Sequence, residues 1–364
     1  MKIALDADPI GRDGSGNETY LRGLVGGLQP ILGVDDELIL MGRQGAALRA
    51  IAAPRTSVLA IGPGIAGEVG TGRSARRAGA DVFVAHYQPP LRFGGPVVTV
   101  VHDVSFRRHP EAFPRISRLR IEATVRWAVR VSALVVAGSE FSRQELLDVY
   151  PRLAPDRVVV TPYAADPCFS ESLPVEDVEA VRRRHRLPER FVLAVGNLQP
   201  RKNLVRLSMA TAQLGVPLVA VGRPGWKADR LRHDVAPGAI AWLGHVSTQE
   251  LRGLYRACTV FAYPSLYEGF GLPILEAMAS GAPVVTSSAA AMPEVAGSAA
   301  VLVDPWSVDD IAAGIGGLID SAARRKELRE RGQARAAEFS WADSATALLA
   351  ELRRVAGRPE GAGQ

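Results

Sequence analysis

The chain has 364 residues, 47% of them hydrophobic and 22% charged, and its 43 Lys and Arg against 38 Asp and Glu leave a formal net charge of +5. This length predicts two domains with sizeable cores, and the composition excludes a disordered or fibrous chain. No apolar run approaches the roughly 18 residues of a membrane span, no signal peptide is recognisable, and two cysteines cannot form a disulfide framework, so we expect a cytoplasmic protein.

Short apolar runs alternate with amphipathic stretches along the whole chain. The strand-like runs are residues 2–5, 58–61, 82–85, 97–101, 133–137, 158–161, 191–195, 218–221, 239–243, 260–263, 284–286 and 300–303. Helical patterns lie between most of them, at residues 19–28, 142–150, 204–213, 248–258 and 308–322. Because many runs are apolar at every position, they predict strands buried on both faces, and therefore an α/β fold with parallel sheets.

The alternation breaks at residues 161–170, which contain two prolines and no periodicity. This break predicts a crossing between an N-terminal domain of residues 1–165 and a second domain of residues 166–339. A helix at about 340–356 is a candidate to pack back on the first domain, and residues 357–364 are an expected frayed tail. Two such domains would create a ligand-binding cleft between the carboxyl ends of their strands.

Residues 263–278, Tyr-Pro-Ser-Leu-Tyr-Glu-Gly-Phe-Gly-Leu-Pro-Ile-Leu-Glu-Ala-Met, are the most informative segment. An expected strand runs into a loop with Gly269 and Gly271, and a helix opens with proline in its first turn. The glycine amides and the positive helix end favour phosphate. Glu268 and Glu276 suit sugar hydroxyls that flank such a phosphate. A capped helix after a glycine turn, with no ligand, is the alternative that the local pattern leaves open.

Glu268 and Glu276, with seven residues between them, resemble the Glu-x7-Glu motif of family 4 retaining glycosyltransferases. Segments that resemble the same family follow in family order over nearly the entire chain, at residues 80–86, 101–105, 138–142, 195–203 and 292–294. The resemblance implies the GT-B fold, two Rossmann-like domains facing a cleft. It also implies transfer of a hexose, with mannose the best match, from a GDP- or UDP-sugar to a hydroxyl of a glycan or lipid-linked acceptor, with retention and with no metal or other cofactor.

The resemblance assigns roles to several residues. Glu268 lies near the transferred sugar, Glu276 binds the nucleotide ribose, and His102 makes polar contact with the sugar. Gly16, in the glycine loop of residues 14–20, lets the backbone approach the diphosphate. The other donor-binding positions that it implies are Asn197, Val246, which lies where the family places the base, Gly269, Phe270, Gly271 and Leu272.

Lys202 is one of only four lysines, against 39 arginines, and it follows the expected strand at 191–195. A compact cation at that strand end can neutralise a leaving diphosphate, and Arg201 can add a planar fork. An exposed pair of cations at a helix start, without a ligand, is the alternative. Asn197 stands where many family members carry Arg, which raises the importance of Arg201.

Two other patterns are weaker. Residues 62–67 fit Gly-x-Gly-x-x-Gly, with Asp81 about twenty residues on, as in dinucleotide sites. The glycine-rich stretch that follows has few periodic apolar residues, so we expect a poor packed helix there and no such site. Asp6 and Asp8 resemble a metal-binding Asp-x-Asp pair, but they end an expected strand, and no cluster of ligands elsewhere supports a metal.

Residues 107–130 hold seven arginines and two glutamates, an excess equal to that of the whole chain. Ile116, Leu119 and Ala123 form a partly apolar face there at helical spacing. We slightly favour a surface helix that packs these aliphatic residues against the protein. The alternatives are a peripheral contact with the inner face of the membrane and a surface that binds an anionic acceptor. Because the charge is local and aromatic residues make up only 6%, no nucleic-acid partner is expected.

Three other functions stay open from the residues alone. The nearest is a sugar-phosphate enzyme of the same fold, either a phosphorylase or a nucleotide-sugar epimerase. A retaining hydrolase would need the two carboxyl groups about 5–5.5 Å apart, and a loop residue and a helix residue need not meet that distance. A non-catalytic nucleotide-sugar-binding protein is the third.

Overall fold

The computed structural model describes residues 1–12, 16–62, 64–225 and 233–357, without the side chains of residues 64–69. Contacts divide the chain into two units. The first contains Met1–Val104, Leu119–Tyr163 and the residues from Ser340 onward, and the second contains Ser105–Arg118 and Ala164–Phe339. This division differs from the predicted one mainly in Ser105–Arg118, which groups with the second unit.

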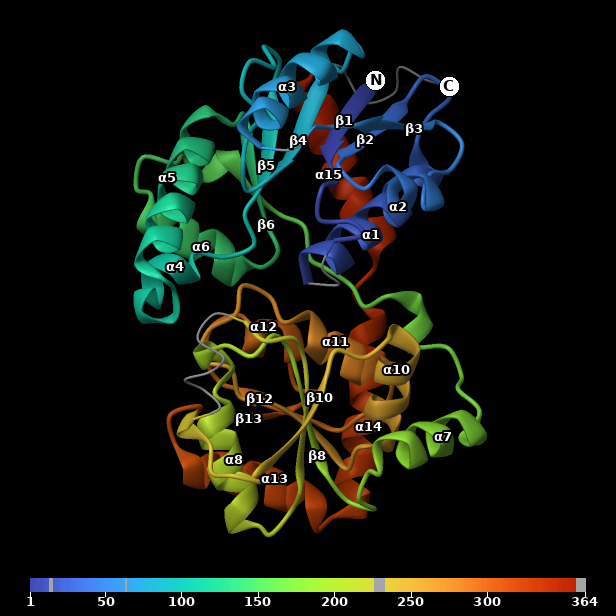
Figure 1. Cartoon of the computed structure of the whole chain (residues 1–364), viewed down its shortest axis with the longest axis vertical. Helices are drawn as coiled ribbons and strands as arrows, with labels where there is room; N and C mark the ends of the chain where they lie inside the picture. The colour runs from blue at the N-terminus through green and yellow to red at the C-terminus, as the bar shows by residue number, and fades with distance from the viewer. Residues whose placement is uncertain (13–15, 63, 226–232, 358–364) are drawn as a thin grey trace. The chain divides into compact units, whose positions relative to one another are not determined.

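The first unit is built on a parallel sheet of seven strands in the order β3-β2-β1-β4-β5-β6-β7 (Figure 1). The strands are β1 (Lys2–Asp6), β2 (Glu37–Gly42), β3 (Thr56–Ala60), β4 (Val82–His86), β5 (Val97–Val100), β6 (Leu134–Ala137) and β7 (Val158–Val160). The helices around them are α1 (Gly16–Leu28), α2 (Gly45–Ala50), α3 (Gly64–Arg77), α4 (Ser105–Arg108), α5 (Arg115–Val131), α6 (Glu140–Val149) and α15 (Trp341–Val355), with α4 and the start of α5 grouped in the second unit.

Helix α15 belongs to the first unit although it ends the described chain. It lies alongside α1, as the red and blue helices show (Figure 1). The two helices approach closely because Gly23 and Gly27 of α1 leave room, and a Cβ at Gly23 would collide with the indole of Trp341. The hydroxyl of Ser344 also donates a hydrogen bond to the carbonyl of Pro162. Small residues on α1 therefore attach the C-terminal helix to the first unit.

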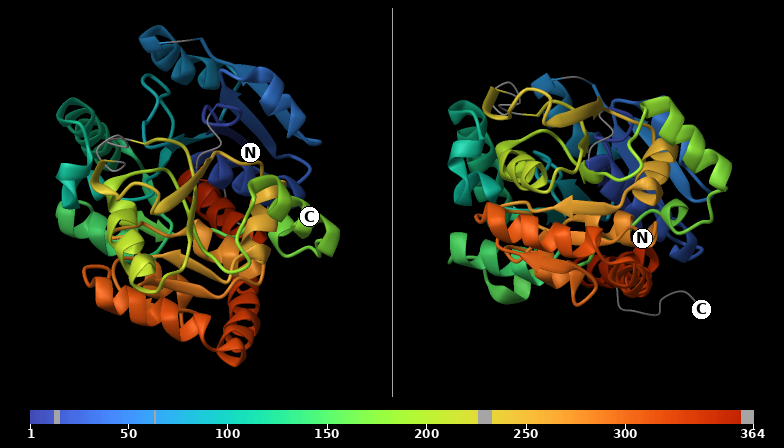
Figure 2. Two further views of the ribbon diagram at one scale, coloured as in Figure 1. Left: turned by 60° about the horizontal axis from the view of Figure 1, so that its bottom comes forward. Right: turned by 90° about the horizontal axis from the view of Figure 1, so that it is seen from below.

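The second unit has a parallel sheet of six strands in the order β10-β9-β8-β11-β12-β13. The strands are β8 (Val192–Val195), β9 (Leu218–Val221), β10 (Ile240–Gly244), β11 (Val260–Tyr263), β12 (Val284–Ser287) and β13 (Val301–Val303). Helices lie on both faces of this sheet (Figure 2), and they are α7 (Val175–His185), α8 (Leu204–Gln213), α10 (Thr248–Ala257), α11 (Leu272–Ala279), α12 (Met292–Ala296), α13 (Val308–Ile319) and α14 (Ala322–Ala337).

The predicted α/β fold with two parallel sheets is confirmed. Strands such as β8 and β11 pack against α8 and α13 through fully buried aliphatic side chains, for example Val192, Leu207, Val260 and Ile311. Burial on both faces explains why these strands are apolar at every position. In both sheets the strand order reverses between two neighbours, β1 and β4 in the first unit and β8 and β11 in the second. Ligands of open α/β sheets bind at such a reversal, outside the carboxyl ends of the strands.

Two features differ from the sequence predictions. The predicted strands do not include β2, although its Leu38–Met41 run is fully buried. The expectation that the stretch after Gly67 makes a poor packed helix is wrong, because α3 continues to Arg77. Gly72 explains the packing: a Cβ there would collide with the carbonyl of Leu91, so glycine lets this helix approach a loop backbone.

Helix α5 is also oriented differently from the favoured prediction. Its buried residues are Val125, Ala128 and Val129, which face the core with helical spacing. Ile116 and Leu119 are 71% and 58% exposed and Ala123 is exposed too, so the interpretation that these three residues pack inward is wrong. The inward stripe lies in the second half of the helix, and the first half presents aliphatic and arginine side chains to solvent. No helix in the described ranges is both long and apolar enough to cross a membrane.

Candidate functional site

The loops after β8 and β11 meet at the strand-order reversal of the second unit. The β8 loop contains a short 3-10 helix, Pro200–Lys202, and the β11 loop leads into α11. The amide of Leu266 donates to the carbonyl of Arg201 at 2.8 Å, and the side-chain amide of Asn203 donates to the carbonyl of Pro264 at 3.0 Å. These bonds hold the two loops together, so residues far apart in sequence occupy one site.

Arg201, Lys202 and Glu268 form a buried ion cluster at this point. The Lys202 ammonium lies 2.7 Å from Glu268 Oε1, and Arg201 Nη1 lies 2.5 Å from Glu268 Oε2. Arg201 also donates to the carbonyl of Tyr267 at 3.0 Å and to Gln199 Oε1 at 3.0 Å. One carboxylate therefore holds two cations side by side, and each cation is oriented by further hydrogen bonds.

The electrostatics of this cluster keep Glu268 ionised. Burial alone would raise the pKa of Glu268, but the charges of Arg201 and Lys202 outweigh burial and lower that pKa to about 2. Lys202 is only 9% exposed, and Glu268 is 6% exposed. At neutral pH the cluster thus has two positive charges and one negative charge, a net positive centre that suits an anionic ligand.

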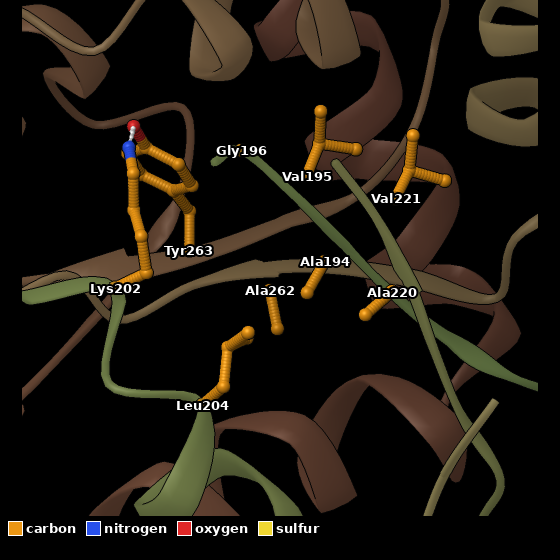
Figure 3. A pocket seen from close by; sticks show the side chains of 9 residues that line it. All are labelled: Ala194, Val195, Gly196, Lys202, Leu204, Ala220, Val221, Ala262 and Tyr263. Carbon is orange, nitrogen blue, oxygen red and sulfur yellow. Dashed lines mark hydrogen bonds between the residues drawn. The ribbon is translucent and has the colours of Figure 1, made fainter. Parts of the chain in front are cut away.

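Tyr263 and Gly196 position the lysine. The Lys202 ammonium lies 2.5 Å from the Tyr263 hydroxyl, and Figure 3 shows the two side chains meeting beside a small cavity at the ends of β8, β9 and β11. Gly196 has φ +142°, and a Cβ there would lie 3.0 Å from Lys202 Cε and 3.2 Å from Nζ. Glycine at this position therefore leaves space for the lysine side chain to reach the site.

Glu276 lies in α11 and has a different environment. It is 8% exposed, and it accepts a hydrogen bond from the hydroxyl of Tyr255 in α10 at 3.1 Å. Burial raises the pKa of Glu276 to about 7, while the Tyr255 hydroxyl lowers it and the charge of Asp166 raises it. Glu268 and Glu276 thus have pKa values displaced in opposite directions, an arrangement that is common where carboxyl groups have different tasks.

The other predicted donor-binding residues lie on the loops of the same unit. Gly269, Phe270 and Leu272 are buried, and Gly271 has φ +109° at the N-cap of α11, a left-handed conformation that favours glycine. Two further positions follow strand ends: Asn197 is exposed after β8, and Val246 is buried after β10.

Two of the predicted site residues, Gly16 and His102, belong to the first unit. Gly16 begins α1 and is exposed, with open space where a Cβ would point, while Gly14 and Ser15 of the same loop lie outside the described residues. His102 follows β5, and both of its ring nitrogens are engaged: Nδ1 lies 2.6 Å from the Tyr163 hydroxyl, and Nε2 lies 2.7 Å from Nε2 of His86.

Comparisons with known proteins identify the family. A model of the glycosyl transferases group 1 matches residues 177–335, and a model of Glycosyltransferase Family 4 matches residues 15–168. The O-antigen chain mannosyltransferase B of Escherichia coli is 35% identical over 262 residues, which cover 69% of this chain and 68% of that protein. The chain belongs to glycosyltransferase family 4. The MMP alpha-(1->4)-mannosyltransferase of Mycolicibacterium hassiacum is 32% identical over 285 residues, 73% of this chain and 67% of that protein.

Solved structures show the fold of this family 4 glycosyltransferase. Anabaena Alr3699/HepE in complex with UDP-glucose matches with a TM-score of 0.76 over 97% of this chain and 100% of that chain, at 21% identity. The predicted GT-B fold and the predicted glycosyltransferase activity are therefore confirmed. The donor, the acceptor, the stereochemistry and the individual site residues stay predictions.

Four side chains that contact the predicted site residues, or their partners, are not among the residues predicted from the sequence: Tyr263, His86, Tyr255 and Tyr163. Tyr263 and His86 stand at the carboxyl ends of β11 and β4, a position that could have drawn attention to them. Tyr255 lies in the last turn of α10 and Tyr163 follows β7, and nothing in their local sequence indicates their partners. Across the described ranges, no three His, Cys, Asp or Glu side chains gather in a way that could hold a metal ion.

Proposed function

We propose that this glycosyltransferase is a retaining, metal-independent enzyme that transfers a hexose, with mannose the leading candidate, from a nucleotide-diphospho-sugar to a hydroxyl of a glycan or lipid-linked acceptor. The observation that carries the proposal is the ion cluster of Arg201, Lys202 and Glu268 at the strand-order reversal of the second unit. The names of the relatives support mannose, and the UDP-glucose bound to Alr3699/HepE supports a nucleotide-sugar donor.

The chemistry places the largest charge change on the leaving group. The bond from the anomeric carbon to the diphosphate breaks with its electron pair, and the acceptor oxygen forms the new bond to that carbon. The acceptor proton passes to a diphosphate oxygen, so no separate base is required. Lys202 and Arg201 would stabilise the charge on the departing diphosphate, which is the role of preorganised cations in phosphate chemistry.

The remaining residues would orient the donor. Glu276, when ionised, can accept hydrogen bonds from the ribose hydroxyls, and the amides of the loop that runs from Gly269 to Leu272 can approach the phosphates. Glu268 would lie beside the transferred sugar while it keeps the two cations in place. In the first unit, the hydrogen-bonded group of His86, His102 and Tyr163 would supply polar contact to the sugar, and Gly16 would let the backbone approach the diphosphate.

A panel of GDP-, UDP- and ADP-sugars, tested by thermal shift and then by NMR of the products, examines this proposal. We expect one nucleotide series to raise the melting temperature and its sugar to be transferred. Lys202→Met should lower kcat by about two to three orders of magnitude, since removing one charge-stabilising group from a transition state has effects of that size. Lys326→Met, at an exposed position of α14, is the matched control.

The outcomes distinguish the alternatives. Isomerisation of the free nucleotide-sugar would indicate an epimerase, and release of free sugar without transfer would indicate a hydrolase. Binding without turnover would indicate a non-catalytic protein. Wild-type transfer by Lys202→Met would refute the role of the ion cluster even if the transferase activity is real.

We also propose that the first half of α5 contacts an anionic membrane surface that carries the acceptor. Ile116 and Leu119 are exposed, and arginines flank them. Basic residues close to an anionic surface contribute about 1 kcal/mol each, and the exposed aliphatic side chains can enter the interface. Flotation with phosphatidylglycerol-containing vesicles should capture the protein, and pure phosphatidylcholine vesicles should not. Equal capture by both, or by neither, contradicts a membrane contact.

A further inference from the structure

A chain of three hydrogen-bonding side chains lies in the first unit. Tyr163, which follows β7, contacts Nδ1 of His102, and Nε2 of His102 contacts Nε2 of His86. His86 is the last residue of β4, and β4 is one of the two strands at which the order of this sheet reverses. His102 lies one strand further from that point. Of the two histidines, His86 therefore occupies the position where α/β sheets bind ligands.

The protons of this chain have one favoured arrangement. Burial lowers the pKa of His102 to about 3 and the pKa of His86 well below its ordinary value, so both rings are neutral at pH 7. A phenol is a stronger acid than a neutral imidazole, so the Tyr163 hydroxyl donates to Nδ1 of His102. Nε2 of His102 then carries a hydrogen and donates it to Nε2 of His86. The remaining hydrogen of His86 must be on Nδ1.

Packing holds Tyr163, which donates the first hydrogen bond, in place. The rings of Tyr20 and Tyr163 have centroids 4.7 Å apart, and Tyr20 also contacts His102 edge-on at 4.8 Å. Trp341 stacks on Tyr163 at 6.1 Å, and a Cβ at Gly138 would lie 2.7 Å from the Tyr163 hydroxyl. Tyr163 therefore has little freedom to turn its hydroxyl away from His102.

The His86 end of these hydrogen-bonded side chains is available to a ligand. His86 is partly exposed, and within the described part of the chain no hydrogen bond involves its Nδ1. His102 differs, since both of its ring nitrogens are already engaged in this unit. We propose that His86 contacts the sugar, donating a hydrogen bond from Nδ1 to a hydroxyl oxygen, and that His102 and Tyr163 are positioning residues that fix its tautomer. This assignment rests on the proposed hexosyl transfer and names a contacting residue for it.

Two variants of His86 separate contact from support. Asn places an amide where Nδ1 of His86 lies but cannot reach His102, whereas Gln reaches the position of Nε2 and leaves nothing at Nδ1. We expect His86→Asn to keep kcat/KM for transfer within about threefold of wild type and His86→Gln to lower it at least about tenfold. A purely structural role of His86 predicts the reverse order, and that order, or wild-type activity of both variants, overturns the assignment.

The same variants show whether the hydroxyl that His86 contacts belongs to the transferred sugar or to the acceptor. A rise in KM confined to GDP-mannose indicates the transferred sugar, and a rise confined to methyl α-mannoside, used as an acceptor probe, indicates the acceptor. Absence of any transfer by the wild-type protein would count against the proposed function instead. Binding of GDP to each variant can still be measured in that case. Failure of the His86 assignment and failure of the proposed function are therefore distinguishable.

Imidazole NMR of protein labelled with ¹⁵N-histidine gives a readout that does not depend on activity. We expect His102 in the Nε2–H form and His86 in the Nδ1–H form, with the His86 signal shifting when GDP-mannose or methyl α-mannoside is added. Tyr163→Phe should mix the tautomers. Tyr20→Phe, which removes a buried hydroxyl with no hydrogen-bond partner in the described ranges, should leave them unchanged. The opposite tautomers, or a His86 signal that neither ligand moves, would overturn the assignment even if both His86 variants are inactive.

Discussion

Glu276→Gln separates the cost of burying a carboxylate from its use in binding. Glu276 is buried and accepts a hydrogen bond from Tyr255, which a glutamine carbonyl can accept as well. Burial raises the pKa of Glu276 from 4.5 to about 7, so the fold binds this proton more tightly than the unfolded chain does. Stability is therefore undiminished below pH 4.5 and falls as pH rises from 4.5 to 7, where the unfolded chain ionises first.

The magnitude follows from the same pKa values. A carboxyl with pKa about 7 in the fold and 4.5 in the unfolded chain costs about 3 kcal/mol once both states are ionised. Glutamine has no charge to bury, so Glu276→Gln should exceed wild type in stability by up to about 3 kcal/mol at pH 8. For a unit of this size that difference corresponds to roughly 6–12 °C in melting temperature. At pH 4.5 and below, the two proteins should have nearly equal stability.

Urea unfolding of both proteins at pH values from 4.5 to 8.5 measures this difference. Glu330→Gln, at an exposed position of α14, is the matched control and should follow wild type at every pH. A stability difference between Glu276→Gln and wild type that is the same at pH 5 and pH 8 would refute the reasoning. So would a variant that is less stable than wild type at pH 8.

The same residue should make donor binding depend on pH. Ribose hydroxyls donate to an ionised carboxylate, so binding of the nucleotide favours the charged form of Glu276 and releases a proton. Calorimetry should show wild-type affinity for GDP rising by up to about tenfold per pH unit as pH increases toward 7, and then levelling. Glu276→Gln should bind more weakly and without this dependence. A wild-type affinity that is constant between pH 5.5 and 8 contradicts an ionised Glu276 in the complex.

Two other replacements test how the lysine is positioned. Gly196→Ala should lower kcat by about tenfold or more, because its Cβ would lie 3.0 Å from Lys202 Cε and its φ of +142° strains alanine. Gly215→Ala, with φ +63° and open space around it, controls for backbone strain. Equal losses of activity in both variants would contradict the steric explanation. Tyr263→Phe removes the hydroxyl that contacts Lys202 and should cost about 1 kcal/mol of transition-state stabilisation, measured by steady-state kinetics. Unchanged kcat and KM would show that the contact does not position the lysine.

The sequence predicted the parts of this molecule that depend on local pattern. Completely apolar runs indicated buried parallel strands, and the segment with Glu268 and Glu276 indicated the family. The position of Lys202 after an apolar strand also predicted that it would lie at a ligand-binding strand end, and the structure places it beside Glu268. These features depend on a few neighbouring residues, so they can be read before the fold is known.

Other features depend on packing between distant segments. The glycines of α3 suggested a poor helix, but Gly72 serves a close approach to the Leu91 carbonyl. The apolar face with Ile116 and Leu119 suggested an inward face, but the inward stripe lies further along the helix. Likewise Tyr255 meets Glu276 only because α10 and α11 belong to the same unit. Local periodicity contains no information about such partners.

The stereochemistry of the product tests the central claim most directly. With GDP-α-mannose as donor and methyl α-mannoside as acceptor probe, the anomeric NMR signals of the new linkage report whether configuration is kept. A donor whose diphosphate leaves toward Lys202 and Arg201 while the acceptor attacks from the same face should yield only the α-linked product. A β-linked product would mean attack from the opposite face, and it would contradict the proposed mechanism at this ion cluster.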